Sequence, residues 1–353
     1  MSAPRVSRRA LGRFVSAGLV SAFVPVLAAG CSAEDEAGDS RRTPESGAGS
    51  KSPDQRTPDR APERPDRRAG FEGRSPFTGL PVDEHGPVLA VKIDNVAAAR
   101  PHLGLRAADL VYVEQVEAGL SRLIAVFSSE FPDRIGPVRS ARESDLEILR
   151  QFGRPAFAYS GANEVVLSLL ADAAPIGMAP DRVAEAYLRS SDRAAPHNLY
   201  LDPKRLLDAG VAADVSVARD IGFRFGPPPA EATSEPVTSR TVSYPAFELT
   251  IRPDRERGRW RLSMDGEPYA ASPATVVIQR VRLLGSKYQR LRDYGSPFLR
   301  TTGEGEATVL RDGRAYPASW SRPTVTAGTT FRDADGDVIN FTRGQTWVIY
   351  DTS

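Results

Sequence analysis

The first 74 residues of this chain cannot contribute to a hydrophobic core, which limits folding to residues 75–353. Residues 1–31 form a leader whose apolar run, from Phe14 to Ala29, stops just before the only cysteine, Cys31. Residues 32–74 are rich in Pro, Ser, Arg, Asp and Glu and hold one aromatic residue, Phe71. Such a segment buries too little apolar surface to offset the entropy lost on ordering it. We therefore expect a disordered tether at 32–74 and a folded body after it.

The leader resembles a twin-arginine signal peptide that ends in a lipobox. Arg8 and Arg9 form the arginine pair, and the apolar run that follows is too short for a membrane-spanning helix. Small residues precede Cys31, whose thiol would carry a diacylglycerol, although Leu27 stands one place earlier than in the usual pattern. We expect export by the twin-arginine route and a lipid anchor on the outer face of the cytoplasmic membrane. An uncleaved anchor or an ordinary signal peptide are the alternatives.

The charge of the mature part argues against nucleic acid as a partner. The leader holds four of the 46 basic residues and none of the 45 acidic ones, so the rest of the chain has a formal charge of −3. A nucleic-acid surface would need Lys and Arg clustered on one face. With a single cysteine in the leader, the body also uses no disulfide.

Apolar runs predict a sheet and two helices in the first part of the body. Residues 88–94, 110–116, 123–128 and 156–159 are β-branched and apolar, as strands are. Ser140 and Glu143 form a capping-box pattern, which predicts a helix that Gly153 ends. A second helix is expected after Gly161, through Val165.

The second part of the body has the alternation of antiparallel strands. Residues 247–251, 260–264, 275–281, 307–310 and 346–350 alternate, and Asp-Gly pairs mark the turns. We expect an α+β protein with a mixed N-terminal α/β domain (75–225), a linker (226–240) and a mostly antiparallel β domain (241–353).

A set of short motifs is spread from about Arg74 to the end of the sequence. They are Pro76–Pro81, Lys92–Asn95, Ala99–Pro101, Gly136–Arg142, Ala195–Tyr200, Gly303–Gly305, Ser319–Ser321 and Gly344–Val348. Together these segments resemble the YerB-like lipoprotein family, a domain of unknown function with a distinct C-terminal partner domain. The resemblance implies a location at the membrane and no established reaction.

The segment from Gly136 to Arg142 is the strongest local signal for a ligand. Arg139 and Arg142 flank Ser140 at an expected helix start, where free amides and the helix dipole favour a carboxylate or phosphate. The alternative is a structural network in which the two arginines pair with Glu114, Glu117 or Glu143.

Polar residues at strand ends extend this candidate site. Gly161 begins the second helix at the end of a strand, where open α/β sheets gather ligands, although it equally fits a tight turn. Asp94 and Asn95 end the first strand, and Arg100 and Arg122 are expected beside them. These side chains fit hydrogen bonding to a polar ligand, or local turn bonding alone.

His197 is the one histidine in a matched motif, next to Asn198, whereas His85 and His102 look isolated in loops. It suits a general acid or base, or a buried structural role. We find no nucleophile elbow and no metal-ligand spacing, and we expect no cofactor or metal.

Together these features predict a noncatalytic envelope lipoprotein with a polar groove for an anionic or sugar-peptide ligand. One alternative is a hydrolase or transferase acting on cell-wall polymer through His197 with Asp94 or Glu117. Another is an adaptor that binds a second envelope protein.

Overall fold

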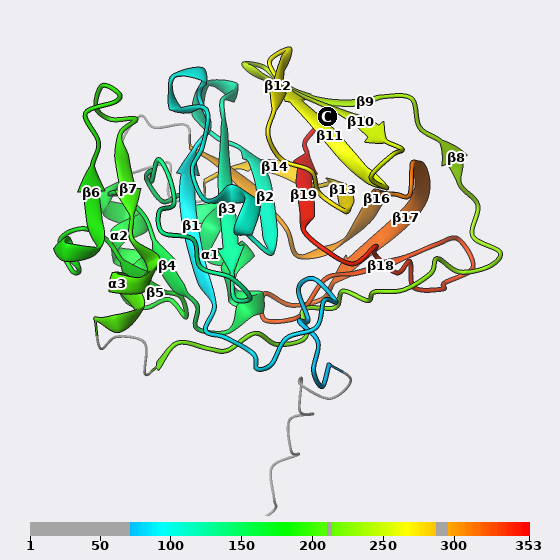
Figure 1. Cartoon of the computed structure of the whole chain (residues 1–353), viewed down its shortest axis with the longest axis horizontal. Helices are drawn as coiled ribbons and strands as arrows, with labels where there is room; N and C mark the ends of the chain where they lie inside the picture. The colour runs from blue at the N-terminus through cyan, green and yellow to red at the C-terminus, as the bar shows by residue number, and fades with distance from the viewer. Residues whose placement is uncertain (1–70, 210–213, 287–295) are drawn as a thin grey trace, which may run out of the picture. The chain divides into compact units, whose positions relative to one another are not determined.

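Strands from both halves of the body form one long mixed sheet (Figure 1). The computed structural model describes residues 71–209, 214–286 and 296–353, and the leader and most of the expected tether lie outside them. The strands of the sheet are β1 (Leu89–Asp94), β2 (Leu110–Gln115), β3 (Ser121–Phe127), β4 (Ala156–Ala158), β5 (Ile176–Met178), β8 (Glu235–Pro236), β13 (Thr275–Arg280), β16 (Gly303–Arg311), β17 (Arg314–Arg322), β18 (Thr330–Arg332) and β19 (Thr346–Asp351). Their order is β18-β17-β16-β13-β19-β2-β3-β1-β4-β5, with β8 beside β17.

The C-terminal strand β19 joins the two halves of the sheet. It runs parallel to β13 on one side and parallel to β2 on the other, and Figure 1 shows it in red beside β2. Most other pairs in the second half are antiparallel, as expected. The predicted boundaries of the two domains stay a prediction, but the segments share this sheet.

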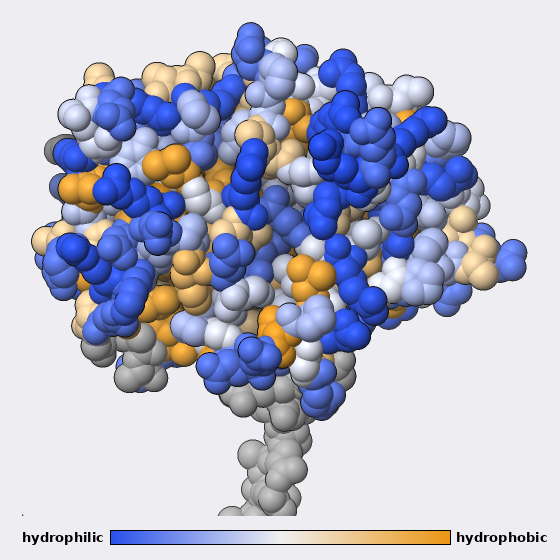
Figure 2. All heavy atoms as spheres, viewed as in Figure 1, coloured by the Kyte–Doolittle hydropathy of each residue, from blue (hydrophilic) through white to orange (hydrophobic). Residues whose placement is uncertain are grey.

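Both faces of the central strands are covered, which explains their continuous apolar runs. Every residue of β1 and of β3 is buried. One face packs with a four-stranded sheet, whose Trp260 shares a core with Trp347 of β19. The other face packs against the first helices, with Ile148 and Tyr112 in one cluster. Hydrophilic residues cover most of the surface in view (Figure 2).

Two hairpins have the Asp-Gly turns that the sequence predicts, one between β11 and β12 of a four-stranded sheet and one between β16 and β17 of the long sheet. The turns at Asp265-Gly266 and Asp312-Gly313 have positive φ at both residues, as tight hairpin turns require. The four-stranded sheet has the order β12-β11-β10-β9. Its strands and those of two hairpins are β9 (Arg240–Tyr244), β10 (Phe247–Asp254), β11 (Arg259–Met264), β12 (Glu267–Tyr269), β14 (Arg282–Gly285), β15 (Pro297–Arg300), β6 (Tyr187–Arg189) and β7 (Leu199–Leu201).

The helices are short and lie between strands of the first half. They are α1 (Glu143–Leu149), α2 (Glu164–Ala171) and α3 (Pro203–Asp208), with 3₁₀ turns η1 (Ala97–Ala99), η2 (Leu105–Ala107), η3 (Glu117–Gly119), η4 (Arg150–Phe152) and η5 (Ala184–Ala186). With many strands and few helices, the α+β prediction is confirmed.

The expected N-cap at Ser140 is wrong, because α1 begins at Glu143 with Arg142 as its N-cap residue. The preceding segment is extended but is not part of a strand: Arg139 N–H donates to the carbonyl of Lys92, and Ser140 Oγ donates to the carbonyl of Ser160. The capping interaction comes instead from Asp145 in the first turn, whose carboxylate accepts the Arg142 N–H at 2.7 Å.

Candidate functional site

Three charged side chains form a row across the sheet where β1 and β2 end and β3 begins. The strand register pairs Asp94 with Arg122, and Arg122 with Glu114. Because side chains alternate along a strand, these three share one face, and Lys92 lies two residues along β1 on that face. All four are at most 5% exposed, so the row is a buried polar network.

Asp94 is the centre of this network. Its carboxylate is fully buried and lies 2.7 Å from His197 Nδ1, 3.2 Å from Arg139 Nε and 3.3 Å from Arg122 Nη1. Only the histidine contact is a well-directed hydrogen bond, since Asp94 Oδ1 and Arg139 Nε lack one, so the arginines act mainly through charge. Removing the carboxylate would leave Arg122 buried without its counter-charge.

His197 is oriented by Asp94 with its second nitrogen free. A carboxylate oxygen accepts hydrogen bonds, so Nδ1 carries the proton in this contact. Within the described residues Nε2 has no hydrogen-bond partner, and the side chain is 24% exposed. Neutral His197 therefore presents a bare Nε2 that can accept a proton or a hydrogen bond.

Arg142 and Glu117 form an ion pair beside Asp94. Arg142 Nε lies 2.7 Å from Glu117 Oε1, and Ser296 Oγ donates to the same oxygen at 2.6 Å. Burial acts to raise the pKa of Glu117, but Arg142 and Ser296 outweigh it, so that pKa lies below its usual range. We call Asp94, Arg122, Arg139, Arg142, His197 and Glu117 the Asp94 cluster.

A buried ion triad lies beneath this cluster. Lys92 Nζ contacts Glu114 and lies 2.6 Å from Asp145 Oδ1, and all three side chains are at most 1% exposed. Burial lowers the pKa of Lys92 to about 8, against the attraction of Asp145. The triad fastens the N-terminal turn of α1 to β1 and β2.

The other sequence candidates lie outside the cluster. Arg100 pairs with Asp265 of the β11–β12 turn at 2.5 Å and donates to the carbonyl of Asn95. The Asn95 side chain donates to Ser121, and Asn198 accepts from Arg189.

Gly161 serves the turn before α2. Its φ is +77°, a conformation that favours glycine, and the N-cap of α2 is Asn163 two residues later. Its carbonyl accepts the Ala141 N–H and so joins the loop to the segment before α1.

The sequence interpretation of His102 as an isolated loop residue is wrong. Its Nε2 lies 2.7 Å from the Asp94 carbonyl, which can only accept, so Nε2 carries the proton and Nδ1 accepts from Tyr269 Oη at 2.6 Å. Burial lowers the pKa of His102 to about 4, so it is neutral at pH 7.

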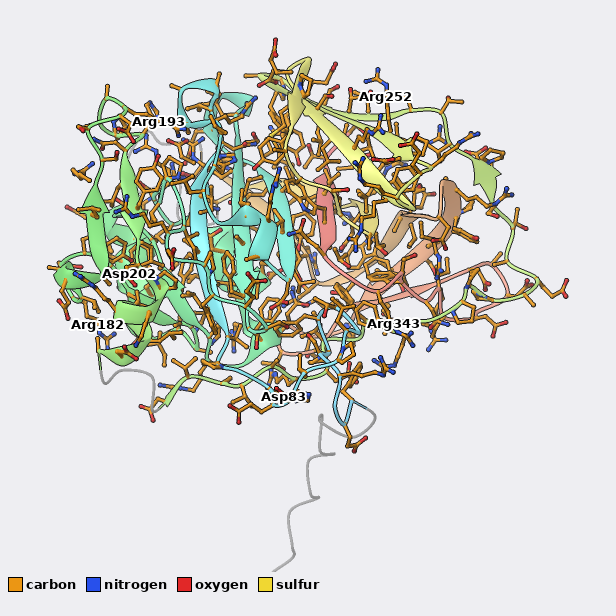
Figure 3. The ribbon with its side chains drawn as sticks, viewed as in Figure 1. Asp83, Arg182, Arg193, Asp202, Arg252 and Arg343 are labelled. Atoms are coloured by element: carbon orange, nitrogen blue, oxygen red, sulfur yellow. The ribbon has the colours of Figure 1, made fainter. Side chains whose placement is uncertain are left out.

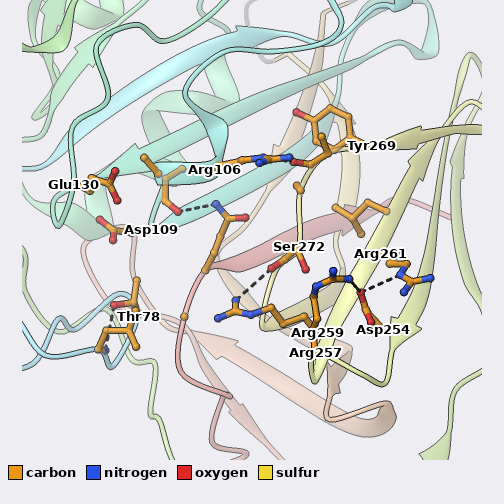
Figure 4. A pocket seen from close by; sticks show the side chains of 18 of the residues that line it. Thr78, Arg106, Asp109, Glu130, Asp254, Arg257, Arg259, Arg261, Tyr269 and Ser272 are labelled. Carbon is orange, nitrogen blue, oxygen red and sulfur yellow. Dashed lines mark hydrogen bonds and ion pairs between the residues drawn. The ribbon is translucent and has the colours of Figure 1, made fainter.

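A large cleft that the sequence did not predict lies between the first half of the body and the four-stranded sheet (Figure 4). Its volume is about 1780 Å³. Five arginines between positions 252 and 261 line it, and this run was the available signal in the sequence. We call this the arginine cleft. Its charged lining residues are Asp83, Glu84, Arg106, Asp109, Glu130, Arg252, Asp254, Arg255, Arg257, Arg259 and Arg261.

The described part of the chain contains no group of three or more His, Cys, Asp or Glu side chains arranged to hold a metal ion. None of its helices has the length and apolarity needed to cross a membrane.

Two long segments of the chain match the two parts of one protein family. Residues 77–216 match the N-terminal domain of the family described as "Protein of unknown function (DUF3048)", and residues 241–348 match its C-terminal domain. The chain therefore belongs to this family, which confirms the resemblance seen in the sequence.

The relatives include a protein of Bacillus subtilis (strain 168) named "Putative lipoprotein YerB". It is 24% identical over 288 residues, which cover 78% of this chain and 85% of that protein. The crystal structure of YerB from Bacillus subtilis matches with a TM-score of 0.67 and 19% identity, over 78% of this chain and 96% of that chain. This structural match supports the fold.

Proposed function

We propose that the protein is an exported lipoprotein, anchored through Cys31 on the outer face of the cytoplasmic membrane, that binds an anionic envelope ligand without changing it chemically. The leader pattern and the relative named as a lipoprotein support the anchor. The Asp94 cluster supports the binding site.

One observation carries the binding proposal: the negative charge of the cluster is centred on a buried carboxylate, whereas Arg139, Arg142 and His197 reach the surface. The carboxylate of Asp94 is fully buried, whereas Arg139 and His197 are 27% and 24% exposed. Arg142 adds a second guanidinium group at 20% exposure. A carboxylate or phosphate group at this surface would meet oriented donors whose counter-charge lies behind them.

A binding titration tests the site. Purified protein is titrated calorimetrically with inorganic phosphate, a phosphorylated glycan and a disaccharide-peptide wall fragment, and saturable binding to at least one is expected. Changing Arg139→Gln with Arg142→Gln should weaken it by about tenfold or more, since charged hydrogen bonds are worth about 1.5–3 kcal/mol each.

Two controls keep this test specific. The matched double variant Arg134→Gln with Arg150→Gln removes two exposed arginines outside the cluster and should bind as the wild type does. His197→Gln, checked for native circular dichroism, should weaken binding even where the arginine variant is unstable. Absence of saturable binding to all three probes would refute the proposal.

A second candidate function is acid–base catalysis on cell-wall polymer. The His197–Asp94 contact favours it, because the carboxylate orients the ring and leaves Nε2 free to take a proton. Incubation of the protein with wall material, followed by mass spectrometry of the supernatant, should then release fragments, and His197→Ala should abolish the release. Release that survives His197→Ala would rule out this role.

The anchor and export route have their own test. Metabolic labelling with a fatty acid should mark the wild type and leave Cys31→Ala unlabelled. Changing Arg8→Lys with Arg9→Lys should hold the precursor inside the cell when export uses the twin-arginine route. Labelling of the Cys31→Ala protein would contradict the lipid anchor on Cys31. Normal export of the arginine variant would contradict the twin-arginine route.

A further inference from the structure

The arginine cleft is separate from the Asp94 cluster and has the dimensions of a site for an extended ligand. Its volume of about 1780 Å³ exceeds the roughly 300–1,000 Å³ of ordinary small-molecule sites. Asp83 and Arg252 both line it and lie well apart in Figure 3, one on the segment before β1 and the other on the four-stranded sheet. No residue of the Asp94 cluster lines it.

One wall of the cleft is basic beyond what its own acid can neutralise. Asp254 accepts from Arg257 at 2.9 Å and from Arg261 at 3.0 Å, and it is the one acidic lining residue on β10 and β11. The side chains of Arg252 and Arg255 make no hydrogen bond or ion pair within the described residues, and both residues are exposed.

The register of the hairpin increases the positive charge on this wall. Arg252 of β10 lies directly opposite Arg261 of β11, and like charges in such a pair repel. Arg259 of the same wall donates to the carbonyl of Ser272 at 3.3 Å and to no carboxylate in the part of the chain that the structure describes. An anionic group bound here would relieve this repulsion.

The facing wall is acidic and equally unpaired. Asp83, Glu84 and Glu130 are exposed and make no side-chain hydrogen bond or ion pair within the described residues. Figure 4 shows Glu130 and Asp109 on one side of the cleft and Arg257, Arg259 and Arg261 on the other.

The two walls do not pair with each other. Within the described ranges, no ion pair joins the acids of the first half to the arginines of β10 and β11, so unlike charges face each other across open space. A polyanion would be repelled by the acidic wall and a polycation by the basic one. The fitting ligand carries both signs at separate points.

We infer that the arginine cleft binds a peptide with free amino and carboxylate groups, such as the peptide part of an envelope polymer. Its carboxylates lie against Arg252, Arg255 and Arg259, and its amine lies toward Glu84 and Glu130. The guanidinium groups suit carboxylates because they bind them in a bidentate way.

Calorimetric titration of the purified protein at low ionic strength tests this inference. The probe is the tetrapeptide Ala-Glu-Lys-Ala, which carries two amines and two carboxylates. We expect saturable binding that weakens by about tenfold when the amines are acetylated, and by about tenfold when the carboxylates are amidated.

Paired variants assign each wall its group. Arg252→Gln with Arg255→Gln should bind the amidated and the free peptide alike, and Glu84→Gln with Glu130→Gln should bind the acetylated and the free peptide alike. Arg134→Gln with Arg150→Gln, outside the cleft, should keep both preferences. The double change of Arg139 and Arg142 should also leave peptide binding intact, so failure of the Asp94 site is distinguishable from failure of the cleft.

Three results would overturn the inference. The first is no saturable binding of the tetrapeptide. The second is equal binding of the free and blocked peptides by the wild type. The third is tight binding of polyphosphate that strengthens in the Glu84→Gln, Glu130→Gln variant while the peptide does not bind, which would make the cleft a polyanion site.

Discussion

The Asp94 cluster and the arginine cleft both concentrate charged side chains, but the buried charges of the cluster are paired and several exposed charges of the cleft are not. In the cluster and the triad beneath it, each buried carboxylate lies against a cation, and Asp94 is fully buried. In the cleft, Arg252 and Arg255 have no partner within the described residues and face solvent. Buried charges need partners because desolvation is costly, whereas exposed charges cost little unpaired. The cluster therefore holds the fold together, and the cleft is free to change with its ligand.

The largest effect is expected from the buried triad. Lys92→Met removes the one cation among the described residues that contacts both Glu114 and Asp145, which leaves two buried carboxylates uncompensated. The free energy of unfolding should fall by about 3–5 kcal/mol. Urea denaturation measures it, and a loss below about 1 kcal/mol would show that the triad contributes little to stability.

The next effect depends on pH. Burial raises the pKa of Asp109, at the base of the cleft, from 3.8 to about 6. The folded state thus keeps the proton on Asp109 to higher pH than the unfolded state does. The contribution of the protonated carboxyl group to stability is therefore complete below about pH 4 and is lost as the pH rises through 6. Relative to the wild type, Asp109→Asn should gain roughly 2–3 kcal/mol of unfolding free energy between pH 4 and pH 7.

Urea midpoints at several pH values check this prediction. His102 opposes Asp109 in the wild type, because its pKa is lowered to about 4 and its contribution is lost as the pH falls. Asp109→Asn should therefore expose a rise of stability with pH that the wild type masks. The exposed control Asp83→Asn should follow the wild type, and parallel curves for Asp109→Asn and wild type would contradict the assignment.

A smaller effect is expected at the rim of the cluster. Arg142 and Glu117 are 20% and 32% exposed, so their pair is partly screened by water. Arg142→Gln should lower the unfolding free energy by about 1 kcal/mol, measured by urea denaturation. A loss of unfolding free energy as large as that caused by Lys92→Met would show that this partly exposed pair stabilises the fold as much as the buried triad does.

The smallest effect should have the opposite sign. Arg252→Glu converts the like-charged pair with Arg261 into an attractive one, so unfolding free energy should rise by about 0.2–1 kcal/mol. The gain should shrink in high salt, because the pair is exposed. Thermal melts at low and high salt measure this gain in stability. Destabilisation by Arg252→Glu would show instead that the arginine stabilises the β10–β11 hairpin.

Local patterns in the sequence predicted the strands well, and long-range placement was not predictable. The segments that form β1, β2, β3 and β19 can be recognised in the sequence by their high content of apolar residues. The insertion of β19 between β2 and β13 depends on its pairing with β2, more than two hundred residues away in the sequence, which no local pattern records.

The candidate site was predicted in part. The sequence motifs pointed to Asp94, Arg139 and His197, and both Arg139 and His197 contact the Asp94 carboxylate in the structure. Ser140 was misplaced because its capping pattern competes with extended hydrogen bonds to Ser160. The role of His102 depends on Tyr269, which lies far away in the sequence, so nothing next to His102 revealed it.

The position of β19 has a consequence for the order in which the protein is made. It is synthesised after every other strand described, yet it occupies the middle of the sheet. Until it emerges from the ribosome, β2 and β13 each have an edge without its native neighbour. Unpaired edges recruit strands from other chains, so the nascent protein passes through a stage in which protection by a chaperone would matter most.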